Sequence, residues 1–123
     1  MTALNSPTTL KKQLIWVSYI VGFLTVVEAI NMLTGRYFNQ FSIYPRELSH
    51  LAYIFTAPFL HANFTHFASN VVTLAIFSVL MLQFGGQRFI TVSCGLILLT
   101  GLLVWLFGRT SFHLGASGII YGY

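Results

Sequence analysis

Long stretches without formal charge separate a few charged positions along this chain. Residues 13–35 carry Glu28 as their only formal charge, and residues 89–108 carry none. A helix needs about 20 apolar residues to cross a bilayer, so both stretches are long enough. The uncharged residues 48–87 include Pro58, which a helix interior does not tolerate, so only the second half of this stretch is continuous. The pattern predicts three membrane-spanning helices, over about 14–34, 66–85 and 89–108.

The connection between the first two predicted spans is long and semi-polar. Residues 36–62 are rich in aromatic side chains, which sit well at the level of the lipid headgroups. Its uncharged residues 48–60, which contain Pro58, cover only about half a membrane crossing. We therefore expect one interfacial segment here rather than a further span. The second and third spans are joined by the short turn Gly85-Gly86-Gln87-Arg88.

A fourth apolar run opens near residue 115 and reaches the last residue, Tyr123. From Ser117 onward it would extend only about 10 Å at roughly 1.5 Å per residue. That is about a third of the hydrocarbon core of a bilayer. The expectation is that the chain stops early in a fourth span and is the N-terminal part of a longer protein.

The composition excludes most soluble classes. Charged residues make up 7% of the chain, whereas a soluble domain carries about 25%. This leaves an all-α, polytopic integral membrane protein in a lipid bilayer. The net charge of +4 is scattered, so no nucleic acid partner is expected, and the single Cys94 excludes an internal disulfide. Lys11 and Lys12 precede the first span and favour a cytoplasmic N-terminus, in a plasma (inner) membrane.

Two clusters place polar groups at membrane depth, and the first contains His61, Asn63, His66 and Asn70. His66 and Asn70 are four residues apart and share one face of a helix. Such groups avoid lipid and face protein or water. They either donate hydrogen bonds to a developing negative charge or join neighbouring helices. A metal site at His61 and His66 is disfavoured, because carboxylates are absent nearby and the spacing is poor.

The second cluster is Gly115-Ala116-Ser117-Gly118. Ser117 stands where a helix begins, and the first N–H groups of a helix have no partner within it. Ser117 is therefore either a nucleophile beside oxyanion donors or a helix N-cap. Gly118 and Gly122 form G-x-x-x-G, which lets another helix approach and bring a base to Ser117. Tyr121 lies on the same face as Ser117, either supporting an imidazole by stacking or as an ordinary interface aromatic.

Together these residues resemble the rhomboid family of intramembrane serine proteases. The matching features are H-x-x-x-x-H-x-x-x-N from His61 to Asn70, the Gly85-Gly86 turn, and Gly115-Ala116-Ser117-Gly118 followed by Tyr121, all within about residues 50–123. The resemblance implies a six-helix core with Ser117 as nucleophile. It implies that His66 and Asn70 are the side-chain donors of the oxyanion hole. Gly115 and Gly118 would support the serine, and Tyr121 would stack on the catalytic histidine.

The resemblance also implies the reaction. The expected function is endopeptidase cleavage of transmembrane segments in single-span substrates, without cofactor or metal. The family's base is a histidine on the sixth helix, but all four histidines of this chain precede Ser117. We therefore expect these residues to be inactive alone and the parent protein to be a protease. The alternatives are a pseudoprotease that binds membrane clients without cleavage, or a small transporter, which would show an inverted repeat that the sequence lacks.

Overall fold

The structure of this chain is a computed structural model that describes residues 7–123. Four α-helices follow one another, and three short 3₁₀ helices lie between the first and the second. The α-helices are α1 (Leu10–Leu33), α2 (Phe64–Leu82), α3 (Gly86–Phe107) and α4 (Ser117–Gly122). The 3₁₀ helices are η2 (Tyr37–Phe41), η3 (Leu48–Ile54) and η4 (Ala57–Phe59). The described part of the chain contains no strand, so the predicted all-α class is confirmed.

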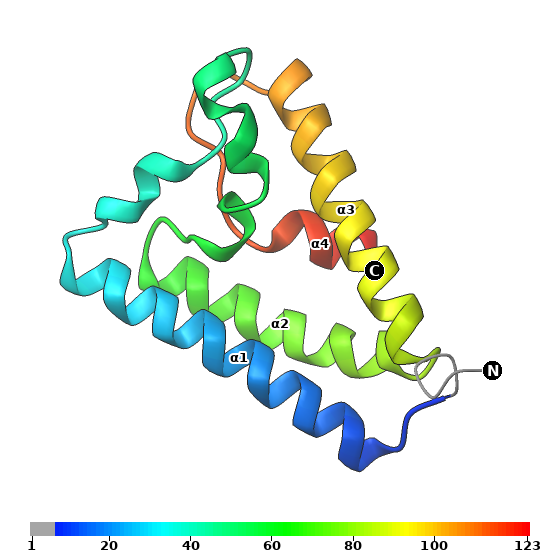
Figure 1. The fold of residues 1–123 in the computed structure, drawn as a ribbon. Coiled ribbons are helices and arrows are strands. Elements are labelled where there is room, and N and C mark those ends of the chain that lie inside the picture. The colour runs from blue at the N-terminus through cyan, green and yellow to red at the C-terminus, as the bar shows by residue number, and fades with distance from the viewer. Residues whose placement is uncertain (1–6) are drawn as a thin grey trace.

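The first three α-helices are long and apolar enough to cross a membrane. Helices α1 and α2 run side by side, whereas α3 turns away from the end of α2 and diverges from it (Figure 1). The short α4 lies between α2 and α3 (Figure 1). Each long helix begins a few residues before the predicted span, because the cap or turn that starts it precedes the apolar run: Thr9 for α1, Asn63 for α2 and Gly85 for α3.

The cap of α2 bears on the polar cluster. The side chain of Asn63 accepts a hydrogen bond from the backbone N–H of His66, with 2.8 Å between Oδ1 and N. An N-cap asparagine satisfies one of the unpaired N–H groups at a helix start and fixes where the first turn begins. His66 therefore stands in a defined first turn, and Asn70 follows one turn later on the same face.

A cluster of buried apolar side chains joins the start of α4 to α1 and α2. Ala116, Ile119 and Ile120 are buried against Leu24 of α1 and against residues of α2. Between helices in a bilayer, such contacts stabilise the fold through van der Waals packing. The packing fixes the start of α4 relative to α2, which carries His66 and Asn70.

The segment between α1 and α2 is bound to the far end of α3, and it contains no helix long enough to cross a bilayer. Ile43 and His113 exchange two backbone hydrogen bonds, of 3.1 and 2.8 Å. Trp105 donates from its indole N–H to the carbonyl of Glu47 at 2.8 Å. Rings of this segment, among them Phe41 and Tyr53, pack edge to face with centroids 5.4 Å apart. The segment is thus an ordered structure over the ends of the helices.

The outer surfaces of the long helices are apolar. Of the most apolar 18-residue stretch of α3, only 11% is buried within the structure. Its large exposed side chains are Ile90, Leu98, Leu99, Leu103, Leu106 and Phe107. A water-facing helix would carry charged residues on this surface, whereas lipid tails solvate it well.

Two glycines of α3 provide a matched test of the packing between α3 and η3. A Cβ atom at Gly101 would lie 2.6 Å from Cβ of the buried Ile54, whereas a Cβ at Gly95 would meet nothing within 4 Å. We expect Gly101→Ala to lower the free energy of unfolding by about 1–3 kcal/mol through overpacking. Gly95→Ala should be neutral or stabilise the protein by up to about 1 kcal/mol. Unfolding midpoints of both variants in detergent measure this, and equal midpoints would contradict the close approach.

Candidate active site

The two residues before α4, Gly115 and Ala116, fix where this helix begins. Gly115 adopts a φ of +111°, which L side chains rarely adopt, and its N–H donates to the carbonyl of Ala57 in η4 at 2.9 Å. Ala116 is the N-cap residue, with 2% of its surface exposed, and Ser117 is the first residue of the helix. The interpretation of Ser117 as an N-cap is therefore wrong, because the buried Ala116 takes that position. The Ser117 side chain is not used as the cap of α4.

Ser117 lines a cavity of about 380 Å³. Its walls come from α2, α3, α4 and the interfacial segment. They include His66 of α2, Thr100 of α3 and Pro58 of η4, together with His113 from the segment before α4. Local sequence patterns do not single out Thr100 or His113 as neighbours of Ser117. They reach this cavity only through the tertiary fold.

His66 and Asn70 converge on the backbone of Gly115. A Cβ atom placed on Gly115 would lie 2.7 Å from Cε1 and 2.9 Å from Nε2 of His66, and 3.3 Å from Nδ2 of Asn70. Only glycine leaves room for both side chains at this point. The Nδ2 group of Asn70 is buried and has no hydrogen-bond partner among residues 7–123. An unpaired buried donor is costly, so this group is available to an acceptor from outside residues 7–123.

A backbone contact determines which nitrogen of His66 carries the proton. The N–H of Ala62 donates to Nδ1 of His66 at 3.4 Å. A ring nitrogen that accepts a hydrogen bond carries no proton, so in the neutral imidazole the proton is on Nε2. That is the nitrogen beside Gly115, and His66 therefore presents a donor there.

His61 is fully buried beside His66, with their ring centroids 5.1 Å apart. Neither of its ring nitrogens has a hydrogen-bond partner in the described residues. Burial, and then the nearby His66 and Arg36, lower the pKa of His61 from its usual 6.5 to about 4. His61 is consequently neutral at physiological pH, since desolvation and the adjacent Arg36 cation both disfavour the imidazolium.

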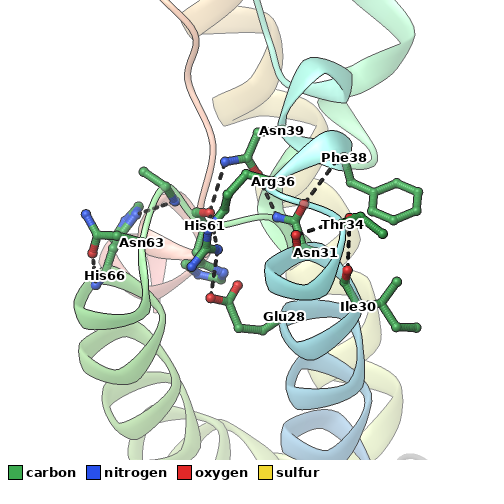
Figure 2. Close-up of polar contacts among 11 residues, drawn as sticks. Glu28, Ile30, Asn31, Thr34, Arg36, Phe38, Asn39, His61, Asn63 and His66 are labelled. Atoms are coloured by element: carbon green, nitrogen blue, oxygen red, sulfur yellow. Dashed lines mark hydrogen bonds and ion pairs between the residues drawn. The ribbon is translucent and has the colours of Figure 1, made fainter.

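Glu28 forms a buried ion pair that connects α1 to the polar cluster. Its carboxylate Oε1 lies 2.7 Å from Nη1 of Arg36, and Glu28 is 3% exposed. Figure 2 shows Arg36 reaching from beyond the end of α1 to the region between Glu28 and His61. An acidic side chain within a membrane span is expected to face the bundle rather than lipid, and Glu28 does so. Its partner Arg36, eight residues later, was missed, although a lone acidic residue in a span is a signal to look for a nearby cation.

The two glycines of α4 pack against α3. A Cβ at Gly118 would lie 3.1 Å from Oγ1 of Thr100, and a Cβ at Gly122 would overlap the side chain of Leu96. The close approach predicted from G-x-x-x-G is therefore present. The helix that faces these glycines, α3, brings a threonine and a leucine, and the delivery of a base to Ser117 by a packed helix stays a prediction. Tyr121 points away from the core and is 89% exposed.

Two further histidines, His50 and His113, form hydrogen bonds to backbone carbonyls and not to Ser117. Nδ1 of His50 bonds to the carbonyl of Ser42, and Nε2 of His113 bonds to the carbonyl of Arg109, each at 2.9 Å. Residues 7–123 hold no group of three or more side chains that would suit a metal ion. Ser117 and His66 thus line one cavity, and Asn70 lies beside Gly115, two residues before Ser117.

Sequence comparison identifies the fold to which this arrangement belongs. The family model described as Rhomboid domain matches residues 45–123, which include the second part of the interfacial segment, His66, Asn70 and Ser117. The chain belongs to the rhomboid family. With its three apolar helices, this rhomboid chain is an integral membrane protein.

Curated relatives come from mycobacteria and are themselves uncharacterized. Proteins of Mycobacterium tuberculosis and Mycobacterium bovis are each 34% identical over 109 residues, covering 84% of this chain and 45% of the relative. A protein of Mycobacterium leprae is 33% identical over 109 residues and 43% of its length. The rhomboid chain therefore spans less than half the length of these relatives. No solved structure gives a significant match.

The buried neutral His61 makes stability depend on pH. Unfolded His61 takes up a proton below about pH 6.5, whereas folded His61 does so only near pH 4. Between about pH 6.5 and pH 4, unfolding therefore takes up a proton. As the pH is lowered through this range, the free energy of unfolding should decrease by up to about 1.4 kcal/mol per pH unit. Unfolding midpoints of the complete protein between pH 7.5 and 4.5 measure this slope. It should be smaller in His61→Phe, and identical slopes in both proteins would refute the assignment.

Proposed function

We propose that the complete protein is an intramembrane serine endopeptidase that cleaves transmembrane segments of membrane proteins. The observation that carries this proposal is the convergence at the start of α4. Ser117 opens onto the cavity that His66 lines, and the unpaired Nδ2 of Asn70 lies beside Gly115. A hydroxyl next to two positioned donors suits the attack on a carbonyl and the stabilisation of the resulting oxyanion.

The reaction follows the usual course of acyl transfer. Ser117 Oγ forms a bond to the scissile carbonyl carbon while a base removes its proton, and the carbonyl oxygen becomes negative. The Nε2–H of His66 and the Nδ2–H of Asn70 donate to that oxygen. The C–N bond then breaks, and the amine leaves with the proton held by the base. Water releases the acyl group from Ser117 and completes the hydrolysis.

The base is proposed to be a histidine C-terminal to residue 123 in the complete protein. Nδ1 of His66 already accepts the N–H of Ala62, and Nε2 of His113 already bonds to the carbonyl of Arg109. Residues 1–123 alone should accordingly lack cleavage activity. The exposed ring of Tyr121, one turn after Ser117, is available to stack on that histidine.

The proposed substrates are single-span membrane proteins with small, helix-destabilising residues near the cut. A helical segment hides its carbonyls in hydrogen bonds, so it has to unwind before Ser117 can attack. The aromatic interfacial segment lies beside the cavity through Pro58 and Ile54, and we propose that a substrate enters there. With the N-terminus cytoplasmic, Ser117 would be near the outer face of the membrane.

Removal of the nucleophile tests the proposal directly. In the complete protein, Ser117→Ala should reduce cleavage of a model single-span substrate by about 10⁴-fold or more, as expected when a serine nucleophile is lost. Labelling by a fluorophosphonate probe should disappear as well. Ser18→Ala is the matched control, because its hydroxyl only bonds to the Leu14 carbonyl on the exposed side of α1. Cleavage retained in Ser117→Ala would refute the nucleophile, and an unlabelled, inactive wild type that still binds clients would favour the pseudoprotease.

Asn70 provides a second test, on the oxyanion donors. Asn70→Ala should lower kcat by about 10–1,000-fold, because one donor to the developing negative charge is removed. Thr73→Ala, in the next turn of α2, should leave kcat unchanged, since its hydroxyl bonds to the Ser69 carbonyl of its own helix. Steady-state cleavage kinetics of both variants measure the difference. An unchanged kcat in Asn70→Ala would return Asn70 to a packing role.

A further inference from the structure

One peptide group between η4 and α2 is hydrogen-bonded on both sides. The carbonyl of His61 accepts from Nη1 of Arg36 at 3.0 Å and from Nδ2 of Asn39 at 3.2 Å. The N–H of the same peptide, that of Ala62, donates to Nδ1 of His66 at 3.4 Å. Because the peptide unit is planar and rigid, the position of Arg36 sets the direction of the N–H that reaches His66.

The two donors on the carbonyl also change the strength of the N–H. Hydrogen bonds in a chain polarise one another, and this effect is larger where water is excluded. A cationic donor on the His61 carbonyl makes the Ala62 N–H a better donor to Nδ1 of His66. The proton of His66 is then kept on Nε2, the nitrogen beside Gly115.

Arg36 is itself held in place by a buried carboxylate. Arg36 has a φ of 66°, outside the helix that it follows, and its guanidinium lies against Glu28 of α1. Figure 2 shows the contacts of Arg36 to Glu28 and to His61 side by side. A carboxylate at this depth is costly unless it is paired, so Glu28 fixes the guanidinium beside the His61 carbonyl. Asn31, fully buried, places the second donor by bonding to Asn39 at 2.7 Å.

We propose that the Glu28–Arg36 ion pair positions the oxyanion donor His66 by holding the His61–Ala62 peptide. Glu28 and Arg36 are positioning residues, since they act on the reaction only through that peptide and the His66 ring. The inference rests on the proposed function for its catalytic consequence. Its structural part, the choice of tautomer at His66, holds whether or not Ser117 is a nucleophile.

Nitrogen-15 NMR of histidine-labelled complete protein reads the tautomer directly. In the wild type we expect His66 to carry its proton on Nε2. Arg36→Met should shift His66 toward a mixture of both tautomers, because the peptide is no longer fixed. The double variant Glu28→Gln/Arg36→Met should do the same while leaving no unpaired charge, which guards against a variant that fails to fold. An unchanged His66 spectrum in both variants would overturn the proposal.

Arg46→Met is a matched control. Arg46 has the same backbone conformation, with a φ of 65°, and its guanidinium also bonds to backbone carbonyls, those of Leu106 and Gly108. These carbonyls belong to the end of α3 and not to the His66 peptide. Arg46→Met should lower the unfolding midpoint and leave the His66 tautomer unchanged. An equal change of tautomer in this control would show a general loosening and also overturn the proposal.

Kinetics distinguish the positioning role from a loss of stability. Arg36→Met should lower kcat by about tenfold or more, up to the loss caused by His66→Ala itself, with KM little changed. In a His66→Ala background the same substitution should change kcat by less than about twofold, since effects that act through one residue are not additive. Full additivity would overturn the proposal. Absence of cleavage in the wild type, with the expected NMR result, would refute the proposed function and leave the positioning of His66 standing.

Discussion

Polar side chains inside a membrane-embedded bundle have no water to bond with, and this constraint organises the structure. Glu28 is paired with Arg36, and Asn31 bonds to the segment that follows α1. These contacts tie the interfacial segment to the last turns of the long apolar helix α1. Asn70, His61 and Ser78 nevertheless hold buried polar atoms that have no hydrogen-bond partner among residues 7–123. Of these, Nδ2 of Asn70 lies beside Gly115 at the start of α4, which makes it the candidate for a functional role.

Small residues decide how closely the helices approach around the candidate site. Gly101 admits Ile54, Gly115 admits His66 and Asn70, and Gly118 admits Thr100. Each of these contacts brings a different element to the cavity beside Ser117. The cavity is therefore a consequence of close packing around it, and the size of a few side chains determines its walls.

The residues matched by the rhomboid family model and the residues that surround His66 overlap only in part. The family match covers residues 45–123, whereas Glu28 and Arg36, which reach His66 through the His61–Ala62 peptide, lie before it. The first helix thus does more than anchor the chain in the membrane. Its one acidic residue is connected to the first turn of α2, where the proposed oxyanion donor stands.

The sequence by itself determined the fold class, the three long apolar helices and the pairing of His66 with Asn70 on one helical face, because each depends on composition or on spacing along one helix. The tertiary structure alone decided that Ala116 rather than Ser117 caps α4, that His113 and Thr100 line the cavity, and that Arg36 reaches both Glu28 and the His61 carbonyl. These features join residues that are far apart in the chain or depend on burial. Local periodicity and spacing carry no information about either, since both arise only when the helices pack together.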